Sequence, residues 1–320
     1  MNPSTSTQRY RQLIEASQRV RWDIDKDVIR GRNFDYTRTF LPAGLSLVDE
    51  LSFLTPADRR FLSQVQGRSY TYIFGLAERF IGAKVMEIGG SHALGDQAAL
   101  EALVRMADEE LKHQELFRRL GAMLAQGMPG GWRAGAEPND VAQAVLSKGT
   151  WAVLALTLDI ELFTQAHFRA SIQPQDDLCP LWKDVYLFHW KEEAQHAMLD
   201  ELEFLRADAQ LTQQQRDAAV GELIDLVGAL DGILQAQAGA DTEYFLAHAT
   251  GQYDAAQREE IARRVLKAYR WQYIVSGVLE PRFRKVLFGL LSSGQAQRVQ
   301  AALEPLAYAV PDRFNMPLAA

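Results

Sequence analysis

The stretches EELKH (109–113) and EEAQH (192–196) share the pattern Glu-x-x-His. On an α-helix, residues three apart lie on the same face, so each stretch can present one carboxylate and one imidazole in the same direction. A further glutamate, Glu78 or Glu161, stands 32 residues before the glutamate of each pattern. The whole set therefore occurs twice, at an offset of 83 residues.

These spacings fit two antiparallel helical hairpins. Two residues at the same height in a hairpin are equally far from its turn. The midpoint between Glu78 and Glu110 is position 94, within GGSHALGD (89–96). The midpoint between Glu161 and Glu193 is position 177, at the end of QPQDD (173–177). Both segments are rich in turn-forming residues, so each hairpin turns where its glutamates require.

The same residues are expected to be buried. Glu110 and His113 fall on an apolar stripe at helical spacing that includes Leu103, Met106 and Phe117. Glu161 follows WAVLALTL (151–158), which is apolar on every helix face. A buried carboxylate must be paired, protonated or bound to a cation, because isolated burial of its charge costs several kcal/mol.

Four carboxylates and two imidazoles predict a centre of two metal ions. Ligation rich in oxygen, with one imidazole for each metal, suits iron or manganese better than zinc or copper. We expect two iron ions, with manganese an alternative at one site. The predicted ligands are Glu78, Glu110, His113, Glu161, Glu193 and His196.

His189 lies on the same helix face as Glu193 and His196, four and seven residues before them. The equivalent position in the first half is Met106, which cannot replace a histidine as an iron ligand here. His189 is either a structural histidine on an apolar stripe or a third histidine ligand. We favour the ligand, which would make the two metal sites unequal.

Other polar residues are not expected to bind the metals. His92 lies in the first turn and His248 in a late segment. His167 and Asp159 fall on different helix faces from Glu161. Gly75 and Gly82 are expected to let two helices approach closely.

The remaining sequence is also dominated by helical patterns, without a convincing strand. We expect one all-α domain over 1–320: a ferritin-like four-helix bundle at about 67–207, an N-terminal extension (1–66) and C-terminal helices (208–320). The expected helices cover 8–20, 56–64, 67–88, 96–126, 139–170, 178–207, 212–236, 241–250, 256–292 with a break near Glu280-Pro281, and 295–307.

The composition excludes several classes of function. A net charge of −7 argues against a nucleic-acid partner and against attraction to anionic membranes. No segment has the roughly 18–20 apolar residues that span a bilayer. The single cysteine, Cys179, rules out an internal disulfide and a Cys-x-x-Cys metal site. Because the N-terminus lacks an apolar signal segment, the expected location is cytoplasmic.

The Glu and Glu-x-x-His ligand set resembles that of the ferritin-like di-iron carboxylate superfamily. The spacing His189-x-x-x-Glu193-x-x-His196 is most similar to the p-aminobenzoate N-oxygenase family, whose di-iron site has an extra histidine there. The resemblance implies an oxidoreductase that activates O2 and oxygenates a small organic substrate, with an amine nitrogen as one candidate. It also implies that Glu109 and Glu192 orient the ligand histidine of the opposite helix.

Several relatives of this superfamily act differently. A ferroxidase or iron-binding protein and an acyl-chain desaturase are the alternatives. Phe117 occupies the usual position of the radical tyrosine of ribonucleotide reductase small subunits, which argues against that activity. A rubrerythrin-type peroxidase would need four cysteines for electron transfer.

The expected partners are O2, a small-molecule substrate and an external electron donor, a ferredoxin or a reductase. The donor must be external because the chain has no flavin, iron–sulfur or nicotinamide motif. A homodimer is expected, since the long segments flanking the bundle favour a built pocket over a storage cage.

Overall fold

The structure is a computed structural model that describes residues 3–311. Within this range it is all-α, and its strand pairing is limited to one isolated bridge between Thr39 and Leu178. The α-helices are α1 (Pro3–Arg19), α2 (Ala43–Ser46), α3 (Pro56–His92), α4 (Gln97–Gly127), α5 (Pro138–Leu146), α6 (Thr150–His167), α7 (Pro180–Asp208), α8 (Gln213–His248), α9 (Ala255–Arg270), α10 (Ser276–Val278), α11 (Pro281–Leu290) and α12 (Ser293–Leu303). Short π-helical segments are η1 (Ile24–Ile29), η3 (Phe168–Ile172) and η4 (Trp271–Val275), and 3-10 turns are η2 (Val48–Glu50) and η5 (Glu304–Ala309).

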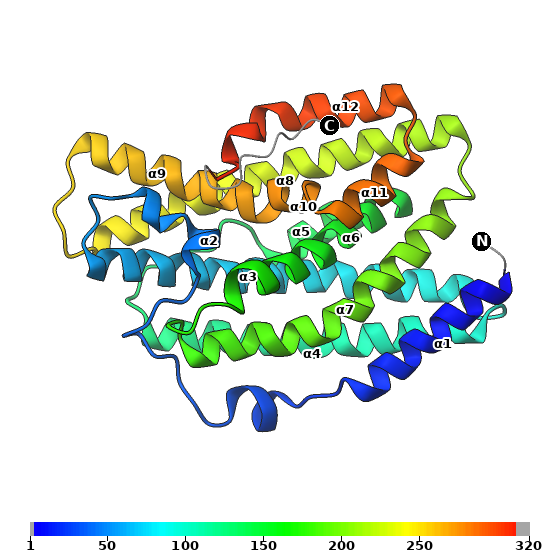
Figure 1. Cartoon of the computed structure of the whole chain (residues 1–320), viewed down its shortest axis with the longest axis horizontal. Coiled ribbons are helices and arrows are strands. Elements are labelled where there is room, and N and C mark those ends of the chain that lie inside the picture. Colours follow the sequence, from blue (N-terminus) through cyan, green and yellow to red (C-terminus); the bar gives the residue numbers. More distant parts are fainter. Residues whose placement is uncertain (1–2, 312–320) are drawn as a thin grey trace.

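The centre of the molecule is a four-helix bundle of two hairpins, α3 with α4 and α6 with α7 (Figure 1). The hairpins also contact each other, α4 against α7 and α3 against α6. A long crossover that contains α5 joins them. The prediction of an all-α fold with a four-helix bundle and extra helices at both ends is confirmed.

Both hairpin turns lie where the glutamate spacing predicted. The first connection, between His92 and Gln97, includes position 94, and the second, between Ile172 and Pro180, includes position 177. Equal distance from the turn therefore places Glu78 beside Glu110 and Glu161 beside Glu193 at similar heights in the bundle.

The glycines on α3 explain how closely it packs on α4. A Cβ atom at Gly75 would lie 3.2 Å from Phe117 Cβ, and one at Gly82 would lie 3.3 Å from Glu110 Cβ. Such separations are tight for carbon atoms, so larger side chains would push the helices apart. The predicted role of Gly75 and Gly82 in close helix approach is confirmed.

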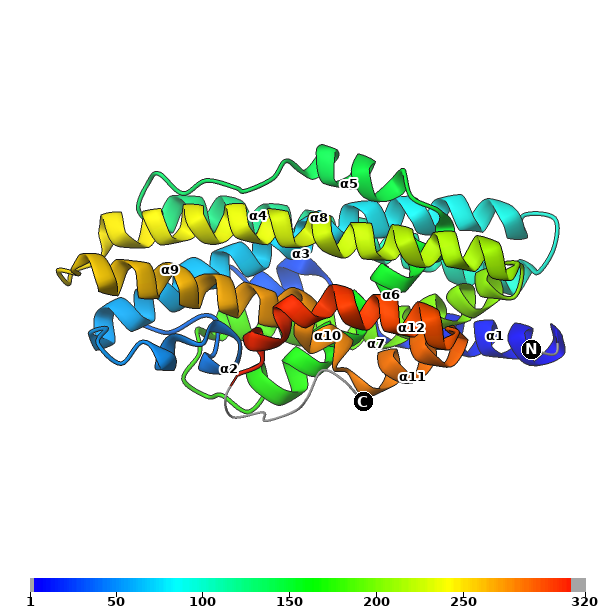
Figure 2. The same cartoon turned by 90° about the horizontal axis from the view of Figure 1, so that it is seen from above.

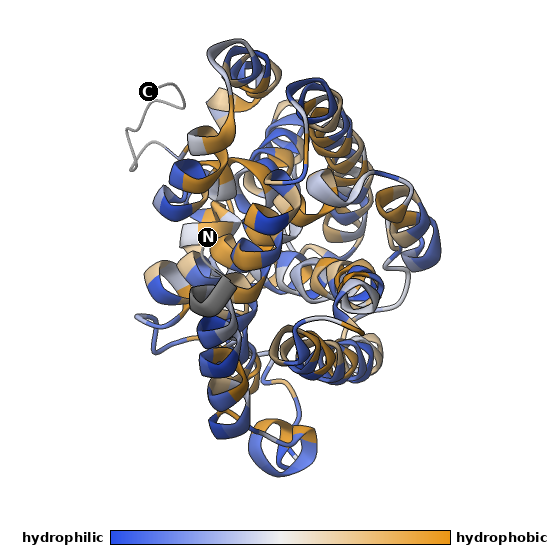
Figure 3. Ribbon diagram, turned by 90° about the vertical axis from the view of Figure 1, so that its right-hand side faces the viewer, coloured by the Kyte–Doolittle hydropathy of each residue, from blue (hydrophilic) through white to orange (hydrophobic). Residues whose placement is uncertain are grey.

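The flanking helices cover the bundle on different sides. Helix α1 packs against α4 and α7, whereas α8 packs against α3 and α6 (Figures 1 and 2). In the view along the bundle, hydrophobic stretches face neighbouring helices and hydrophilic ones face outward (Figure 3). The buried apolar side chains form one core that includes residues from Tyr10 to Ala309.

Several predicted helix boundaries were wrong. The expected helices 56–64 and 67–88 form one helix, α3, which continues through Gly89 and Gly90 to His92. Helical glycines cost only about 1 kcal/mol each, which packing against α4 can offset. Segments 212–236 and 241–250 likewise form one helix, α8, because its interior has small residues but no proline.

The expected helix at 139–170 is interrupted, in contrast, at residues 147–149, and it ends in the π-helical segment η3. The predicted break near Glu280-Pro281 is present, since α11 begins at Pro281. Residues 312–320 of the predicted C-terminal region lie outside the described residues. Every helix within residues 3–311 is too short or too polar to cross a membrane.

Candidate metal centre

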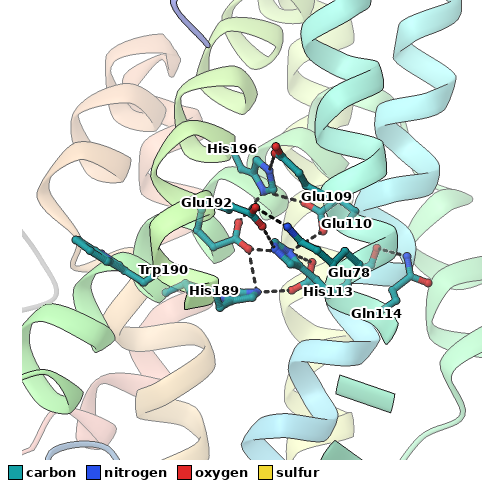
Figure 4. Close-up of polar contacts among 12 residues, drawn as sticks. Glu78, Glu109, Glu110, His113, Gln114, His189, Trp190, Glu192 and His196 are labelled. Atoms are coloured by element: carbon teal, nitrogen blue, oxygen red, sulfur yellow. Dashed lines mark hydrogen bonds and ion pairs between the residues drawn. The ribbon is translucent and has the colours of Figure 1, made fainter. Parts of the chain in front are cut away.

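The four bundle helices bring all seven predicted ligand residues into the interior. Figure 4 shows five of them, Glu78, Glu110, His113, His189 and His196, turned toward one another. Each of the seven residues is at most 3% exposed. Glu78 comes from α3, Glu110 and His113 from α4, Glu161 from α6, and His189, Glu193 and His196 from α7. Periodicity and hairpin spacing therefore placed these residues correctly in the core.

Three histidines make short contacts with the central carboxylates. His189 Nε2 lies 2.9 Å from both Glu78 Oε1 and Glu193 Oε1. His113 Nδ1 lies 3.0 Å from Glu193 Oε1. Donor atoms about 3 Å apart are at the spacing of neighbouring ligands around an ion with bonds of about 2.0–2.2 Å.

The two carboxylate oxygens of Glu193 contact different histidines, and so do those of Glu110. The Oε1 atom of Glu193 faces His113 and His189, whereas its Oε2 atom lies 2.8 Å from His196 Nδ1. Glu110 Oε1 lies 3.0 Å from His196 Nδ1, and Glu110 Oε2 lies 3.7 Å from His113 Nδ1. Each of these two carboxylates therefore turns its two oxygens to different imidazoles.

Two groups of four residues can each hold a metal ion. Within each group, one potential ligand atom from every residue lies within 4.8 Å of the others. The first group is Glu78, His113, His189 and Glu193, and the second is Glu110, His113, Glu193 and His196. His189 belongs to the first group, in contact with Glu78 and Glu193.

The hydrogen bonds within the cluster do not satisfy its polar atoms. Five buried ligand atoms have no hydrogen-bond partner among the described residues: Glu78 Oε2, Glu110 Oε1, Glu110 Oε2, His113 Nδ1 and Glu193 Oε1. Buried polar groups in proteins are almost always hydrogen-bonded, and an unpaired one costs about 1–3 kcal/mol. Metal coordination would satisfy these atoms, so the cluster fits a metal ion.

Glu109 and Glu192 each contact the Nε2 atom of the motif histidine on the opposite helix. Glu192 Oε2, on α7, lies 2.8 Å from His113 Nε2 on α4. Glu109 Oε2, on α4, lies 2.8 Å from His196 Nε2 on α7. These contacts direct both Nδ1 atoms inward, as the resemblance implied. Such carboxylate–histidine pairs are common behind metal ligands.

Further contacts fix the two outer carboxylates. Glu109 accepts hydrogen bonds from Ser17 Oγ (2.6 Å) and Gln195 Nε2 (2.8 Å). Glu192 pairs with Lys112 Nζ at 2.5 Å. The Lys112 amine also lies 3.9 Å from the centre of the Trp22 ring, which stacks on His113.

Charge interactions perturb the pKa values of the central groups. Burial and the neighbouring Glu78 raise the pKa of Glu110 to about 7. Burial alone would raise the pKa of Glu193, but the nearby histidines lower it well below its usual range. The buried carboxylates repel one another, so the pKa of each depends on how close it lies to the histidines.

Glu161 is buried beside this centre but belongs to neither four-residue group. Burial, and then its proximity to Glu193, raise the pKa of Glu161 well above its usual range. Glu193 is thus the charged neighbour with the largest effect on this carboxyl, and His196 has a smaller, opposing effect.

Sequence reasoning missed three contributors near the cluster. Asp200 is 2% exposed, and burial raises its pKa well above the usual range, with His196 opposing this shift and Glu110 adding to it. It lies four residues after His196 on the same helix face, a spacing that could have revealed it. Ser17 and Trp22 come from the N-terminal extension, and no local pattern links them to the motifs.

The polar residues that we set aside lie elsewhere. His167 contacts Tyr70 Oη and Ser276 Oγ, at 2.9 and 2.8 Å. His92 contacts Glu203, and His248 contacts the Gly130 carbonyl. The Asp159 carboxyl packs against Gly277.

No family model, no curated protein and no solved structure matches the chain in sequence or structure comparisons. The geometry alone thus defines the site: a buried cluster of glutamates and histidines, inside a helical bundle, that can hold a metal ion.

Proposed function

We propose that this chain is a di-iron oxidoreductase that activates O2 and oxidises a small organic substrate. The observation that carries the proposal is the pair of overlapping ligand groups, several of whose buried donor atoms lack hydrogen-bond partners among the described residues. The two hairpins joined by one long crossover are also the arrangement of ferritin-like bundles.

The contacts suggest a division of the ligands. Glu78, His113 and His189 would hold one iron, and His196, with the nearby Glu161, would hold the other. Glu110 and Glu193 would bridge, because each faces histidines on both sides. Bound iron would supply the redox chemistry of O2 activation.

The protein's own residues would orient and shield this centre. Glu109 and Glu192 keep the Nδ1 atoms of His196 and His113 turned inward. An apolar cavity adjoins Glu78, Glu161 and His189 and would hold the substrate away from bulk water. An external ferredoxin or reductase would supply electrons, and the chain would act as a homodimer.

The cavity supports substrate oxidation over iron storage, since storage requires no organic binding site. Its predominantly apolar lining also supports a second candidate function, oxidation of a hydrocarbon chain as in acyl-chain desaturases. Both candidates use the same ligands. Oxygenation of an amine stays a third possibility for the same centre.

The test is anaerobic loading of the metal-free protein with Fe(II), followed by O2. We expect about two irons per chain, as the ligand count of di-iron bundles requires, and oxidation of both, seen in optical and Mössbauer spectra. Uptake of one iron or none would contradict the proposal.

The His189→Ala variant tests the unequal ligation. It should change the Mössbauer signal of one iron and leave the helical circular dichroism unchanged. His167→Gln is the matched control, because His167 is equally buried but lies outside the cluster. It should leave both iron signals as in the wild type.

A further inference from the structure

An apolar cavity runs alongside the candidate metal centre. Its walls come from α3, α5, α6, α8 and the π-helical segment η4, and His189 adds one side from α7. Its empty volume, with the space that is open to solvent included, is about 900 Å³. Glu78, Glu161 and His189 line it, so a bound molecule would lie next to the metal ligands.

The remaining wall is almost entirely hydrocarbon. Apart from the three cluster residues, its polar side chains are Thr164 and Tyr273. The Thr164 hydroxyl already donates to the Ile160 carbonyl at 2.7 Å. Among the described residues, the lining includes no lysine or arginine. An anionic ligand would be buried without a counter-charge, which costs several kcal/mol.

Tyr273 is the exception in this wall. It is 3% exposed, and its hydroxyl has no hydrogen-bond partner among the described residues. The rings of Tyr70 and Phe163, 5.9 and 6.3 Å away between centres, hold it in place. Burial raises the pKa of Tyr273 well above its usual range, so its hydroxyl stays protonated and can donate.

The position of Tyr273 also limits where a polar group can bind. A second, smaller apolar cavity shares Leu156, Leu230 and Tyr273 with the first. Tyr273 thus lines both cavities, and its hydroxyl is the buried group there without a partner among the described residues. One acceptor on a ligand would satisfy it, and the rest of the ligand would contact hydrocarbon.

We propose that the substrate is an uncharged, mainly hydrocarbon molecule whose single acceptor oxygen, such as a carbonyl or hydroxyl, binds the Tyr273 hydroxyl. Tyr273 is then a residue that determines specificity, and carboxylate-bearing substrates such as aminobenzoates are disfavoured. That this ligand is a substrate rests on the proposed oxidoreductase function. Its binding to the cavity does not, and this binding can be measured on the metal-free protein.

The experiment measures displacement of the neutral dye Nile red from the metal-free protein. The competitors are decan-2-one, decane and decanoate, which share their chain length and differ in polarity and charge. We expect decan-2-one to bind most tightly, decane about 2–10-fold more weakly, as for one lost hydrogen bond, and decanoate at least about tenfold more weakly.

Two variants locate the binding. Tyr273→Phe should reduce the affinity for decan-2-one to that for decane and leave decane unchanged. Ala229→Trp, at an exposed position of the cavity lining on α8, should weaken all binding. Ala236→Trp, on an exposed position of the same helix away from the cavity, is the matched control and should bind like the wild type.

The outcomes separate this proposal from the metal function. Decanoate binding as tightly as the ketone, an unchanged ketone affinity in Tyr273→Phe, or no displacement by neutral ligands would each overturn it, whatever the iron uptake. The expected ligand ranking in a protein that fails to take up two irons would support the binding site and refute the oxidoreductase.

Discussion

Each motif histidine is held at its Nε2 atom by a glutamate of the opposite helix, and this contact orients the ring. The Nε2 atoms of His113 and His196 contact Glu192 and Glu109, so their Nδ1 atoms must face the centre. His189 differs, because its Nδ1 atom is buried without a partner and its Nε2 atom faces inward. The three imidazoles are therefore oriented by different means.

His167, a buried histidine outside the cluster, gives a prediction about how the stability of the protein depends on pH. Burial lowers the pKa of His167 from 6.5 to about 3 in the folded protein. The unfolded chain takes up a proton on this histidine below pH 6.5, whereas the folded chain does not until about pH 3. Stability must therefore fall as the pH falls through this window, by up to about 1.4 kcal/mol per pH unit.

The measurement is urea unfolding of metal-free wild type and His167→Gln between pH 7.5 and 4.5. Glutamine cannot be protonated and can still hydrogen-bond to Tyr70 and Ser276. We expect the free energy of unfolding of the variant to fall less steeply as the pH is lowered. The two slopes should differ by close to the value for one proton, about 1.4 kcal/mol per pH unit. Parallel stability curves for the two proteins would rule out a buried neutral His167.

At the scale of elements, the close α3–α4 hairpin controls the position of Glu110. A Cβ atom at Gly82 would lie 3.3 Å from Glu110 Cβ. We predict that Gly82→Val forces the helices apart, costs about 1–3 kcal/mol in unfolding free energy and weakens metal binding. Unfolding by denaturant and metal titration measure the two effects.

Gly90→Val supplies the control on the same helix. A Cβ atom at Gly90 meets nothing within 4 Å, so this variant has the same change in helix propensity without the steric conflict. It should bind metal like the wild type. Equal metal binding by both variants would show that the Gly82 contact does not position Glu110.

The π-helical segment η4 is a second element with a consequence for the site. A π-helical turn inserts an extra residue into the helical repeat and changes which side chains face inward. In this chain it turns Tyr273 into the wall of the cavity, far in sequence from the ligands. The sequence predicted a helix through this region but gave no signal for the altered turn.

At the scale of the whole molecule, the bundle concentrates carboxylates at the expense of stability. Glu78, Glu110, Glu161 and Glu193 are each at most 3% exposed. We predict that Fe(II) or Mn(II) raises the unfolding temperature of the metal-free protein by about 5 °C, since a ligand at a hundredfold excess over its Kd adds about 2.7 kcal/mol. Anaerobic differential scanning calorimetry measures this shift.

The Glu110→Gln variant is the comparison, because it removes one buried carboxylate and should exchange metal binding for stability of the metal-free protein. Without metal it should melt above the wild type, because one buried charge is removed. With metal it should gain less than the wild type does. An unfolding temperature of the wild type that does not respond to either ion would contradict a metal centre at this cluster.

The sequence by itself determined the helical class, the two hairpins and the burial of seven Glu and His side chains. These properties depend on local periodicity and on equal distances from a turn, which can be read along the chain. Only the tertiary structure decided the contacts of Ser17 and Trp22, the offset position of Glu161 and the cavity at Tyr273. Each depends on packing between segments far apart in sequence, and no local spacing specifies that packing.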